Sequence, residues 1–246
     1  MNVAVVFAGG VGSRMGSAVP KQFLELNGRP VLAHALGIFQ SHPRVDRIVL
    51  VAAPERFDDC RELAARYGIT KLERLAACGD SAQASIYNGL RSAAEVFPPE
   101  TTVLLHDGVR PYLEPWVVDA NLDAVERFGS AVTYTPCYET IVVSKDGETI
   151  SAMPYRRESY TVQAPQSFRL GDILAAHERI RARPEGYADM VDQATLCWTL
   201  GLPIHLVRGN RGNVKITTPE DIVMLEALLR RQAAGGSTLT GMAKKE

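Results

Sequence analysis

The chain has 246 residues, and its 27 lysines and arginines against 28 aspartates and glutamates leave a formal net charge of −1. Hydrophobic residues make up 46% of the chain and charged residues 22%, a balance that excludes a disordered protein. The near-zero charge excludes the broad basic surface of a nucleic-acid-binding protein, although it allows a local basic cleft. The sequence contains no run of about 18 apolar residues, so it predicts no membrane-spanning helix.

Short apolar runs alternate with amphipathic stretches from the N-terminus to Thr135. Most of the apolar runs lack polar alternation, as do strands of a sheet that is covered on both faces. The predicted strands are Val3–Phe7, Arg47–Ala52, Leu72–Ala76, Thr102–His106 and Ala131–Thr135. The predicted helices are Pro30–Gln40, Glu55–Tyr67, Ser81–Val96 and Pro115–Phe128. This order predicts an α/β fold, a single Rossmann-like domain over residues 1–232 with a mostly parallel twisted sheet flanked by helices.

The alternation breaks after Thr135, where two apolar stretches flank Lys145-Asp146-Gly147. Asp-Gly is a strong hairpin signal, so we expect a β-hairpin arm over about residues 137–154, with strands at Glu139–Ser144 and Glu148–Met153. The run Thr140–Val143 is too apolar for a solvated ribbon. The arm therefore either buries one face against a second copy of the chain, giving a homodimer, or folds back onto its own domain.

Helical signals return at Gly171–Arg183 and Asp189–Leu200, and a strand is predicted at Ile204–Arg208. Thr218 then acts as the N-cap of a helix that runs to about Arg231, with Pro219 in its first turn. Residues 233–246 are rich in Gly, Ser, Ala and Lys, and we expect a flexible tail there.

Cysteine usage and the N-terminus predict a cytoplasmic location. The cysteines are widely spaced and form no C-x-x-C pair, so we expect reduced thiols and no zinc site of that kind. They are Cys60, Cys78, Cys137 and Cys197. The first apolar run leads straight into a glycine loop, so we expect a buried strand there and not a targeting signal.

That loop is the most informative segment of the chain. It reads Ala8-Gly9-Gly10-Val11-Gly12-Ser13-Arg14-Met15-Gly16, and Pro20-Lys21-Gln22-Phe23 follows. Small residues at the carboxyl edge of a parallel sheet let backbone N–H groups approach an anion, and Arg14 and Lys21 suit a polyphosphate. The dinucleotide pattern G-x-G-x-x-G fails because position 15 is Met15, and no Gly-Lys-Ser/Thr closes a Walker loop.

Together these motifs resemble the nucleotidyltransferases that join a nucleoside triphosphate to a sugar or polyol phosphate. Pro20-Lys21-Gln22 narrows the resemblance to the cytidylyltransferases acting on 2-C-methyl-D-erythritol 4-phosphate or on ribitol 5-phosphate. Further stretches agree in order: Gly79-Asp80 with Ser85, then His106–Pro111, Arg156 with Pro165–Phe168, and Asn213–Thr217. The resemblance covers about residues 1–230.

The resemblance implies transfer of CMP from CTP to a polyol phosphate, with release of pyrophosphate and with Mg²⁺ or another divalent cation as cofactor. The attacking group is already a phosphate oxygen, so such a site needs cations and backbone N–H groups and no strong general base. By resemblance, the catalytic residues are Arg14, Lys21 and Lys215. The CTP-binding residues are Ala8, Gly9, Gly10, Gly12, Gly79, Asp80 and Ser85. The acceptor-binding residues are Arg110, Thr140 and Arg156, and Asp107 is the metal ligand.

The resemblance also bears on assembly and on the acceptor. Thr140 lies on the predicted arm, so two subunits would share an active site if the arm pairs them. Ala8-Gly9-Gly10, Gly108-Val109 and the pattern around Arg156 look more like the ribitol branch, so we expect D-ribitol 5-phosphate as the acceptor. The alternative is 2-C-methyl-D-erythritol 4-phosphate, in isoprenoid precursor synthesis.

Two positions depart from the family pattern. Ala82 stands where arginine is usual, and Ala164 stands where a threonine usually precedes Pro-Gln. The first change affects the support of the nucleotide loop, and the second removes a hydroxyl near the acceptor. Two other classes stay open as hypotheses, an NAD-type oxidoreductase on a Rossmann sheet and a catalytically silent nucleotide-binding protein.

Overall fold

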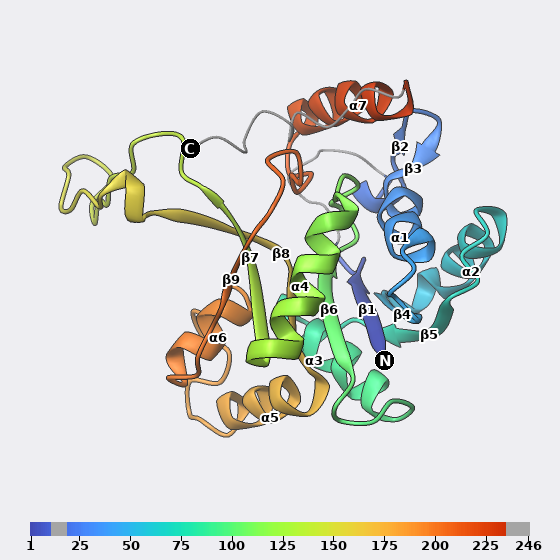
Figure 1. Ribbon diagram of the computed structural model, residues 1–246, viewed down its shortest axis with the longest axis horizontal. Helices are drawn as coiled ribbons and strands as arrows, with labels where there is room; N and C mark the ends of the chain where they lie inside the picture. The colour runs from blue at the N-terminus through green and yellow to red at the C-terminus, as the bar shows by residue number, and fades with distance from the viewer. Residues whose placement is uncertain (11–18, 235–246) are drawn as a thin grey trace.

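The computed structural model describes residues 1–10 and 19–234, in which a twisted seven-stranded sheet lies between two layers of helices (Figure 1). The strand order across the sheet is β5-β4-β1-β6-β8-β7-β9. These strands are β1 (Asn2–Phe7), β4 (Arg47–Ala52), β5 (Leu72–Ala77), β6 (Thr102–Asp107), β7 (Ser130–Pro136), β8 (Tyr160–Arg169) and β9 (Leu206–Arg208). Within this sheet β8 runs antiparallel to both of its neighbours, and the other pairs are parallel. The mostly parallel α/β fold predicted from the sequence is confirmed.

Alternate residues of the central strand β1 feed two separate cores, one on each face of the sheet. Ala4 and Val6 join the core under α1, α2 and α4, whereas Val3 and Val5 join the core under α3, α5 and α6. The helices are α1 (Val31–Ser41), α2 (Phe57–Arg66), α3 (Ala82–Ala94), α4 (Pro115–Phe128), α5 (Leu170–Arg181), α6 (Gln193–Thr199) and α7 (Pro219–Ala233). None of the helices in the described part of the chain has the length and apolar character that crossing a bilayer requires.

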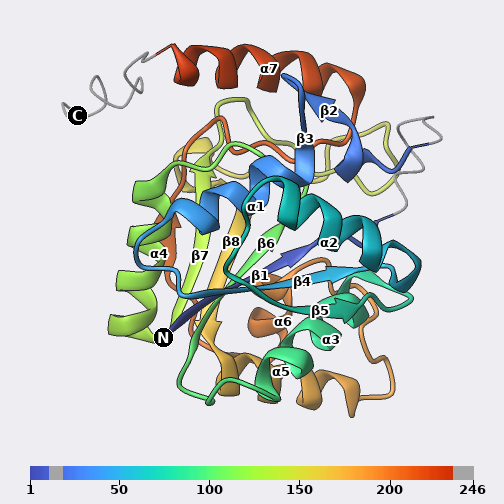
Figure 2. The same ribbon diagram turned by 90° about the vertical axis from the view of Figure 1, so that its right-hand side faces the viewer.

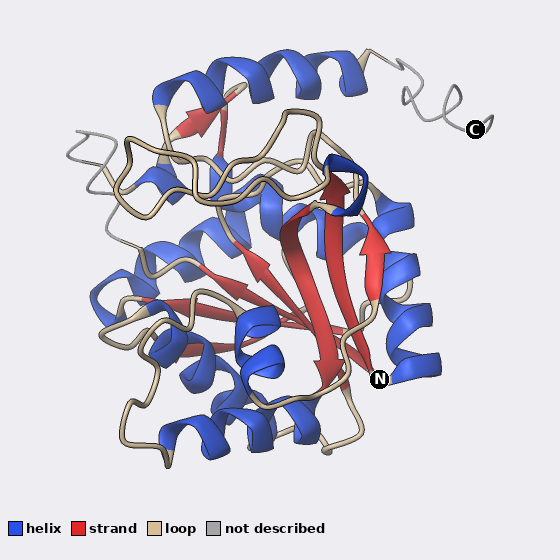
Figure 3. Ribbon diagram, turned by 90° about the vertical axis from the view of Figure 1, so that its left-hand side faces the viewer, coloured by secondary structure: helices blue, strands red, loops and turns tan. Residues whose placement is uncertain are grey.

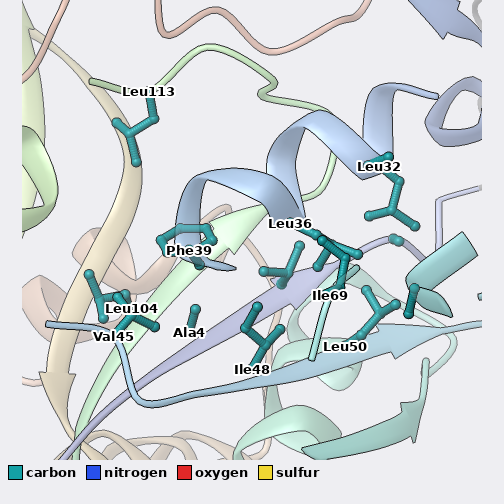
Figure 4. Close-up of a cluster of buried hydrophobic side chains, with 14 of the residues drawn as sticks. Ala4, Leu32, Leu36, Phe39, Val45, Ile48, Leu50, Ile69, Leu104 and Leu113 are labelled. Atoms are coloured by element: carbon teal, nitrogen blue, oxygen red, sulfur yellow. The ribbon is translucent and has the colours of Figure 1, made fainter. Parts of the chain in front are cut away.

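Figure 4 shows how α1 covers the first face of the sheet. Leu32, Leu36 and Phe39 lie at helical spacing, all three are completely buried, and they point from α1 towards the sheet, where they share a core with Ile48 and Leu50 of β4. Burying each of these side chains contributes about 1.5–3 kcal/mol relative to leaving it exposed. This packing fixes the height of α1 above β1, and so the frame in which the loop after β1 sits.

The last helix lies outside these two layers. Figure 2 shows α7 above the small antiparallel pair β2 (Glu25–Leu26) and β3 (Arg29–Pro30). Leu225 of α7 is buried against Leu26 and Ile216. As predicted, Thr218 caps this helix, in a capping box with Asp221. The helix thus holds down the segment that precedes it.

Several element predictions hold, and others are wrong. The strand Arg47–Ala52 and the helix Pro115–Phe128 have the predicted bounds, and Gly129 ends that helix with a φ of 80°. The helix predicted from Asp189 begins only at Gln193, because the Asp192 carboxylate accepts a hydrogen bond from the Thr195 N–H and caps it. The pair β2–β3 and the long strand β8 were not predicted.

The segment 137–159 leaves the body between β7 and β8 and projects from it as an arm (Figure 1). The predicted two-stranded hairpin is not formed, since the described residues of the arm show one isolated bridge, between Val143 and Ala152. The Asp-Gly turn is present, because the Asp146 carboxylate accepts from the backbone N–H groups of Glu148 and Thr149. Apolar side chains of the arm are exposed in the single chain: Tyr138, Val142, Val143, Ile150, Met153 and Tyr155. Their exposure argues against an arm that packs on its own domain.

Candidate active site

The candidate site lies at the carboxyl ends of β1 and β6, which run parallel and pair Phe7 with Asp107. Figure 3 shows the strands ending below the loops that cover this edge of the sheet. A cleft of about 250 Å³ opens here. One wall carries the charged residues Asp107, Arg110 and Lys215. The apolar part of its lining includes Ala82, Ile86, Val162, Ala164 and Val191.

Glycines let the loops at this edge pack closely. A Cβ on Gly9 would lie 2.5 Å from the Cys78 Cβ, and one on Gly108 would lie 2.9 Å from the Phe7 carbonyl oxygen. Ala8 itself is buried. Gly10 is exposed and has open space at its Cα, which suits the close approach of a phosphate. Gly12 and Arg14, predicted to bind and neutralise the triphosphate, lie outside the described residues.

Asp107 is the centre of the charged wall. Its Oδ2 accepts from Arg110 Nε at 2.8 Å, and its Oδ1 accepts from Lys215 Nζ at 2.9 Å. Burial by itself would raise the pKa of the Asp107 carboxyl, but the two cations outweigh burial and hold that pKa well below its ordinary value. The carboxylate is therefore ionised at neutral pH.

Lys21, from the segment after the glycine loop, binds the backbone next to Lys215. Its Nζ donates to the carbonyl oxygen of Ile216 at 2.9 Å, one residue beyond Lys215. The next residue, Gln22, is buried, and its Nε2 donates to the Ala8 carbonyl at 2.7 Å. The Pro-Lys-Gln motif thus has a local physical reason: the glutamine fastens the loop to the end of β1, and the lysine binds the segment that carries Lys215.

The second predicted nucleotide loop runs from Gly79 to Ser85. A Cβ on Gly79 would lie 2.6 Å from the Ala84 Cβ, so only glycine fits there. The Ser85 hydroxyl accepts from the Gly79 N–H at 3.0 Å and donates to the Ser81 carbonyl at 2.8 Å. Its first role is to shape the loop. Asp80 is exposed beside the N-terminus of α3, whose dipole favours a nearby anion.

His106 directly precedes Asp107 of the charged wall, and no catalytic role was predicted for it. Its side chain is completely buried, and burial lowers its pKa to about 4. Its Nε2 contacts the Arg110 carbonyl at 3.2 Å, and its ring meets Phe39 edge-on. A neutral, tightly packed imidazole of this kind indicates that His106 contributes to the core and not to the chemistry of the site.

The predicted acceptor residues do not all come together in the single chain. Arg110 lines the cleft, whereas Thr140 and Arg156 are exposed on the arm and do not line it. Some cleft residues were not predicted, among them Asp192, whose Oδ2 accepts from Gln166 Nε2 at 2.9 Å. The Pro165-Gln166 motif was the available signal for Gln166, but no local pattern in the sequence places Asp192 in the same cleft as Lys215.

The donors present fit a magnesium ion bound mainly by substrate. The described residues contain no group of three or more His, Cys, Asp or Glu side chains that could hold a metal by themselves. Mg²⁺ in nucleotide sites commonly uses one or two carboxylates together with phosphate oxygens and water. Asp107 is an ionised carboxylate in the cleft, so it can supply the protein's ligand.

Known proteins resemble this chain along most of its length. A family model described as 2-C-methyl-D-erythritol 4-phosphate cytidylyltransferase matches residues 2–231. A ribitol-5-phosphate cytidylyltransferase of Streptococcus agalactiae is 40% identical over 93% of this chain and 95% of its own length. A 2-C-methyl-D-erythritol 4-phosphate cytidylyltransferase of Geotalea uraniireducens is 38% identical over 92% of this chain and 96% of its own length. The crystal structure of a 4-diphosphocytidyl-2C-methyl-D-erythritol synthase from Anaerococcus prevotii superimposes with a TM-score of 0.79, at 26% identity, over 94% of this chain and 98% of that one.

Proposed function

The chain belongs to the family of 2-C-methyl-D-erythritol 4-phosphate cytidylyltransferases and is a cytidylyltransferase that acts on a polyol phosphate, and we propose that its acceptor is D-ribitol 5-phosphate. The reaction would convert CTP and this acceptor into CDP-ribitol and pyrophosphate. The observation that carries the choice is the 40% identity to a ribitol-5-phosphate cytidylyltransferase over 93% of the chain. The loop Gly108-Val109 supports it. The oxidoreductase and silent-protein hypotheses gain no support from these relatives.

The alternative acceptor is 2-C-methyl-D-erythritol 4-phosphate, which the 38% identity to the Geotalea uraniireducens enzyme favours. Ala164 lines the cleft at a position where the family usually has a threonine. It therefore bears directly on the choice of acceptor, because an apolar methyl group stands where a hydroxyl is usual. The expected cytoplasmic location stays a prediction.

The proposed chemistry is displacement at the α-phosphorus of CTP. An oxygen of the acceptor phosphate forms the new P–O bond, the bond to the bridging α–β oxygen breaks, and its electron pair leaves with pyrophosphate. The attacking oxygen is already an anion, so no residue has to remove a proton. The protein's work is to hold two anions in line and to offset the charge that builds up at the reacting phosphorus.

The residues of the cleft divide this work. Gly10 and the rest of the glycine loop would receive the triphosphate on backbone N–H groups, with Arg14 and Lys21 as its cations. Arg110 would bind the acceptor phosphate, and Lys215, on the same wall, would neutralise the transferring phosphoryl group. We propose Asp107 as the ligand of a Mg²⁺ ion, which when bound would offset phosphate charge. Since Arg110 and Lys215 now neutralise Asp107, a phosphate that enters the cleft would take over the two cations.

We also propose that two chains share each site. The arm exposes apolar side chains and carries Thr140 and Arg156 away from the cleft of its own chain. An arm that pairs with a second copy would bury the apolar side chains and bring these two residues to the acceptor end of that copy's cleft. Arg156 would then bind the acceptor phosphate from the side opposite Arg110.

A pyrophosphate-release assay tests the proposed function. The chain is incubated with CTP, Mg²⁺ and either ribitol 5-phosphate or 2-C-methyl-D-erythritol 4-phosphate, and ribitol without phosphate serves as the control. Release of pyrophosphate with ribitol 5-phosphate, at a higher kcat/KM than with the other acceptor, supports the proposal. A higher kcat/KM with 2-C-methyl-D-erythritol 4-phosphate would overturn it.

A further inference from the structure

We propose that Asn213 is a positioning residue for the cleft cations, which holds the segment Asn213–Ile216, and with it Arg110 and Lys215, in register against β8. The proposal deepens the function proposed above and rests on it, because Arg110 and Lys215 are the residues assigned there to the acceptor and to the transferring phosphate. It concerns a side chain that need not touch either substrate.

The side chain of Asn213 ties this segment to β8. Asn213 is completely buried, and its Nδ2 donates to the Ala164 carbonyl oxygen at 2.5 Å. The same Nδ2 lies 3.4 Å from the Gln163 Oε1. Both partners belong to β8 and line the cleft. The amide therefore connects β8 directly to the residue that begins the cation-bearing segment.

The main chain of the same residue holds a cleft cation. The carbonyl oxygen of Asn213 accepts from Arg110 Nη1 at 2.8 Å, while Arg110 Nε binds Asp107. Two residues after Asn213, Lys215 Nζ binds the other oxygen of Asp107. A shift of Asn213 would thus move the anchor of Arg110 and the origin of the Lys215 side chain together.

Few backbone hydrogen bonds outside its own loop fix this segment, although Ile216 packs under α7 against Leu225. Asn213–Ile216 belongs to no helix or strand, and its backbone tie to the site's own loop is the bond from the Ile216 N–H to the Val109 carbonyl, 3.0 Å long. Side-chain hydrogen bonds therefore contribute a large share of its placement. Ladder bonds would otherwise set the register of such a segment, as they do for β6 beside β1.

The chemistry of the Asn213 amide also indicates a role in geometry. Its Oδ1 is buried and has no hydrogen-bond partner among the described residues. A buried polar atom without a partner lowers stability, and an apolar side chain would avoid that cost. Unsatisfied polar atoms of this kind in native proteins call for a specific reason, and the donor bond to β8 supplies one.

Asn210 offers a matched control in the same loop. It is also a buried asparagine, and its side chain bonds main-chain groups, accepting from the Glu114 N–H and donating to the Tyr112 carbonyl, each at 3.3 Å. Neither of these bonds reaches Arg110, Lys215 or β8. Replacing Asn210 removes another buried amide and leaves the side-chain bonds of Asn213 and Arg110 intact.

The experiment compares Asn213→Ala and Asn210→Ala with the unchanged chain. The measurements are kcat and both KM values with CTP and whichever acceptor the unchanged chain turns over, thermal unfolding, and calorimetric binding of CTP and of ribitol 5-phosphate. We expect Asn213→Ala to lower kcat about 100-fold, since a displacement of about 1 Å costs this much. The acceptor KM should rise about tenfold, as expected for a charged group that loses its hydrogen-bond geometry. The Kd of CTP should change less than about twofold, because the glycine loop is unaffected.

The control and its alternatives make the test decisive. Asn210→Ala should lose a comparable amount of thermal stability yet keep kcat within about threefold of the unchanged chain. Equal losses of kcat in the two variants would overturn the positioning role. The role would also be overturned if Asn213→Ala folds and keeps both kcat and the acceptor KM within about twofold of the unchanged chain. If Asn213→Ala does not fold, Asn213→Ser replaces it, because its hydroxyl is too short to reach the Ala164 carbonyl and the same split is expected.

Failure of the proposed function would look different. An unchanged chain that releases no pyrophosphate with either acceptor contradicts the function. The calorimetric arm then still tests Asn213, with ribitol 5-phosphate as the probe. Weaker binding in Asn213→Ala than in Asn210→Ala supports the positioning role, and equal binding in the two contradicts it.

Discussion

The Nζ of Lys21 donates a hydrogen bond of 2.9 Å to the carbonyl oxygen of Ile216, although the two residues lie 195 positions apart in the chain. Arg110 makes a similar bond to the carbonyl of Asn213. One short segment thus gathers two cations on its carbonyl oxygens and presents a third, Lys215, from its own side chain. The basic cleft of this nearly neutral protein is built around that segment.

Removal of either lysine should slow the reaction strongly. Lys21→Ala and Lys215→Ala each remove a cation that we assign to charge developing in the transition state. Loss of one such group typically costs about 3–4 kcal/mol of barrier, so kcat should fall about 10²–10³-fold. Steady-state pyrophosphate release measures this, and an unchanged kcat in either variant contradicts the assigned role.

Lys71 is the control for these two variants. Its Nζ also donates to backbone carbonyls, those of Phe39 and His42, on a part of the molecule that does not line the cleft. Lys71→Ala should therefore lower thermal stability and leave kcat unchanged. A loss of kcat in Lys71→Ala as large as that in Lys21→Ala would mean that the effect arises from the fold.

Asp107→Asn tests the metal assignment. The substitution keeps the size of the side chain, but it removes the charge that pairs with Lys215 and that would bind Mg²⁺. We expect the Mg²⁺ concentration for half-maximal turnover to rise by at least about tenfold. Chelation with EDTA should abolish turnover of the unchanged chain, and added Mg²⁺ should restore it. An Asp107→Asn variant with an unaltered Mg²⁺ dependence would remove Asp107 from the metal site.

Mixing inactive variants tests the shared site. Arg156→Ala and Lys215→Ala should each be nearly inactive alone. After the two are unfolded and refolded together, half of the dimers hold one subunit of each kind, and one cleft of each such dimer has both residues intact. About a quarter of the wild-type activity should return. No recovery, although sedimentation shows a dimer, would place Arg156 in the cleft of its own chain or outside the reaction.

The buried His177 predicts a loss of stability in acid. Burial lowers the pKa of His177 to about 4, below the ordinary value of 6.5. The unfolded chain therefore binds a proton that the folded chain does not, and the stability from this residue, present above pH 6.5, is lost as the pH falls towards 4. Urea unfolding should show that His177→Phe loses about 2 kcal/mol less than the unchanged chain between pH 7 and pH 5. Equal losses in the two proteins contradict the prediction.

The parallel half of the fold was readable from the sequence because its strands are covered on both faces. Continuous apolar runs such as Arg47–Ala52 leave few alternative structures, and Pro115 with Gly129 marks both ends of α4. The strand β8 could not be read in this way. It is exposed in its first half and buried in its second, and it contains Pro165, which argues against a central strand. The register of β7 shifts between Val132 and Tyr134, opposite this irregular stretch.

The site was predictable only where a motif carries it. The glycine loop and Lys21 follow from a pattern that phosphate chemistry explains, and Lys215 follows from the family resemblance. Asn213 and Asp192 were not predicted as functional, because their importance depends on contacts with residues far away in the sequence, such as Ala164 and Gln166. For Ser85 the structure adds a role that the pattern did not contain, since its hydroxyl holds the loop from Gly79 to Ser85 in shape.

A competition experiment tests the central claim most directly. Equal concentrations of ribitol 5-phosphate and 2-C-methyl-D-erythritol 4-phosphate are incubated with limiting CTP, Mg²⁺ and the unchanged chain. The two CDP-polyol products are then separated and quantified by mass spectrometry. The product ratio equals the ratio of the two kcat/KM values. The account predicts CDP-ribitol as the dominant product, and an excess of the CDP-methylerythritol product would contradict it.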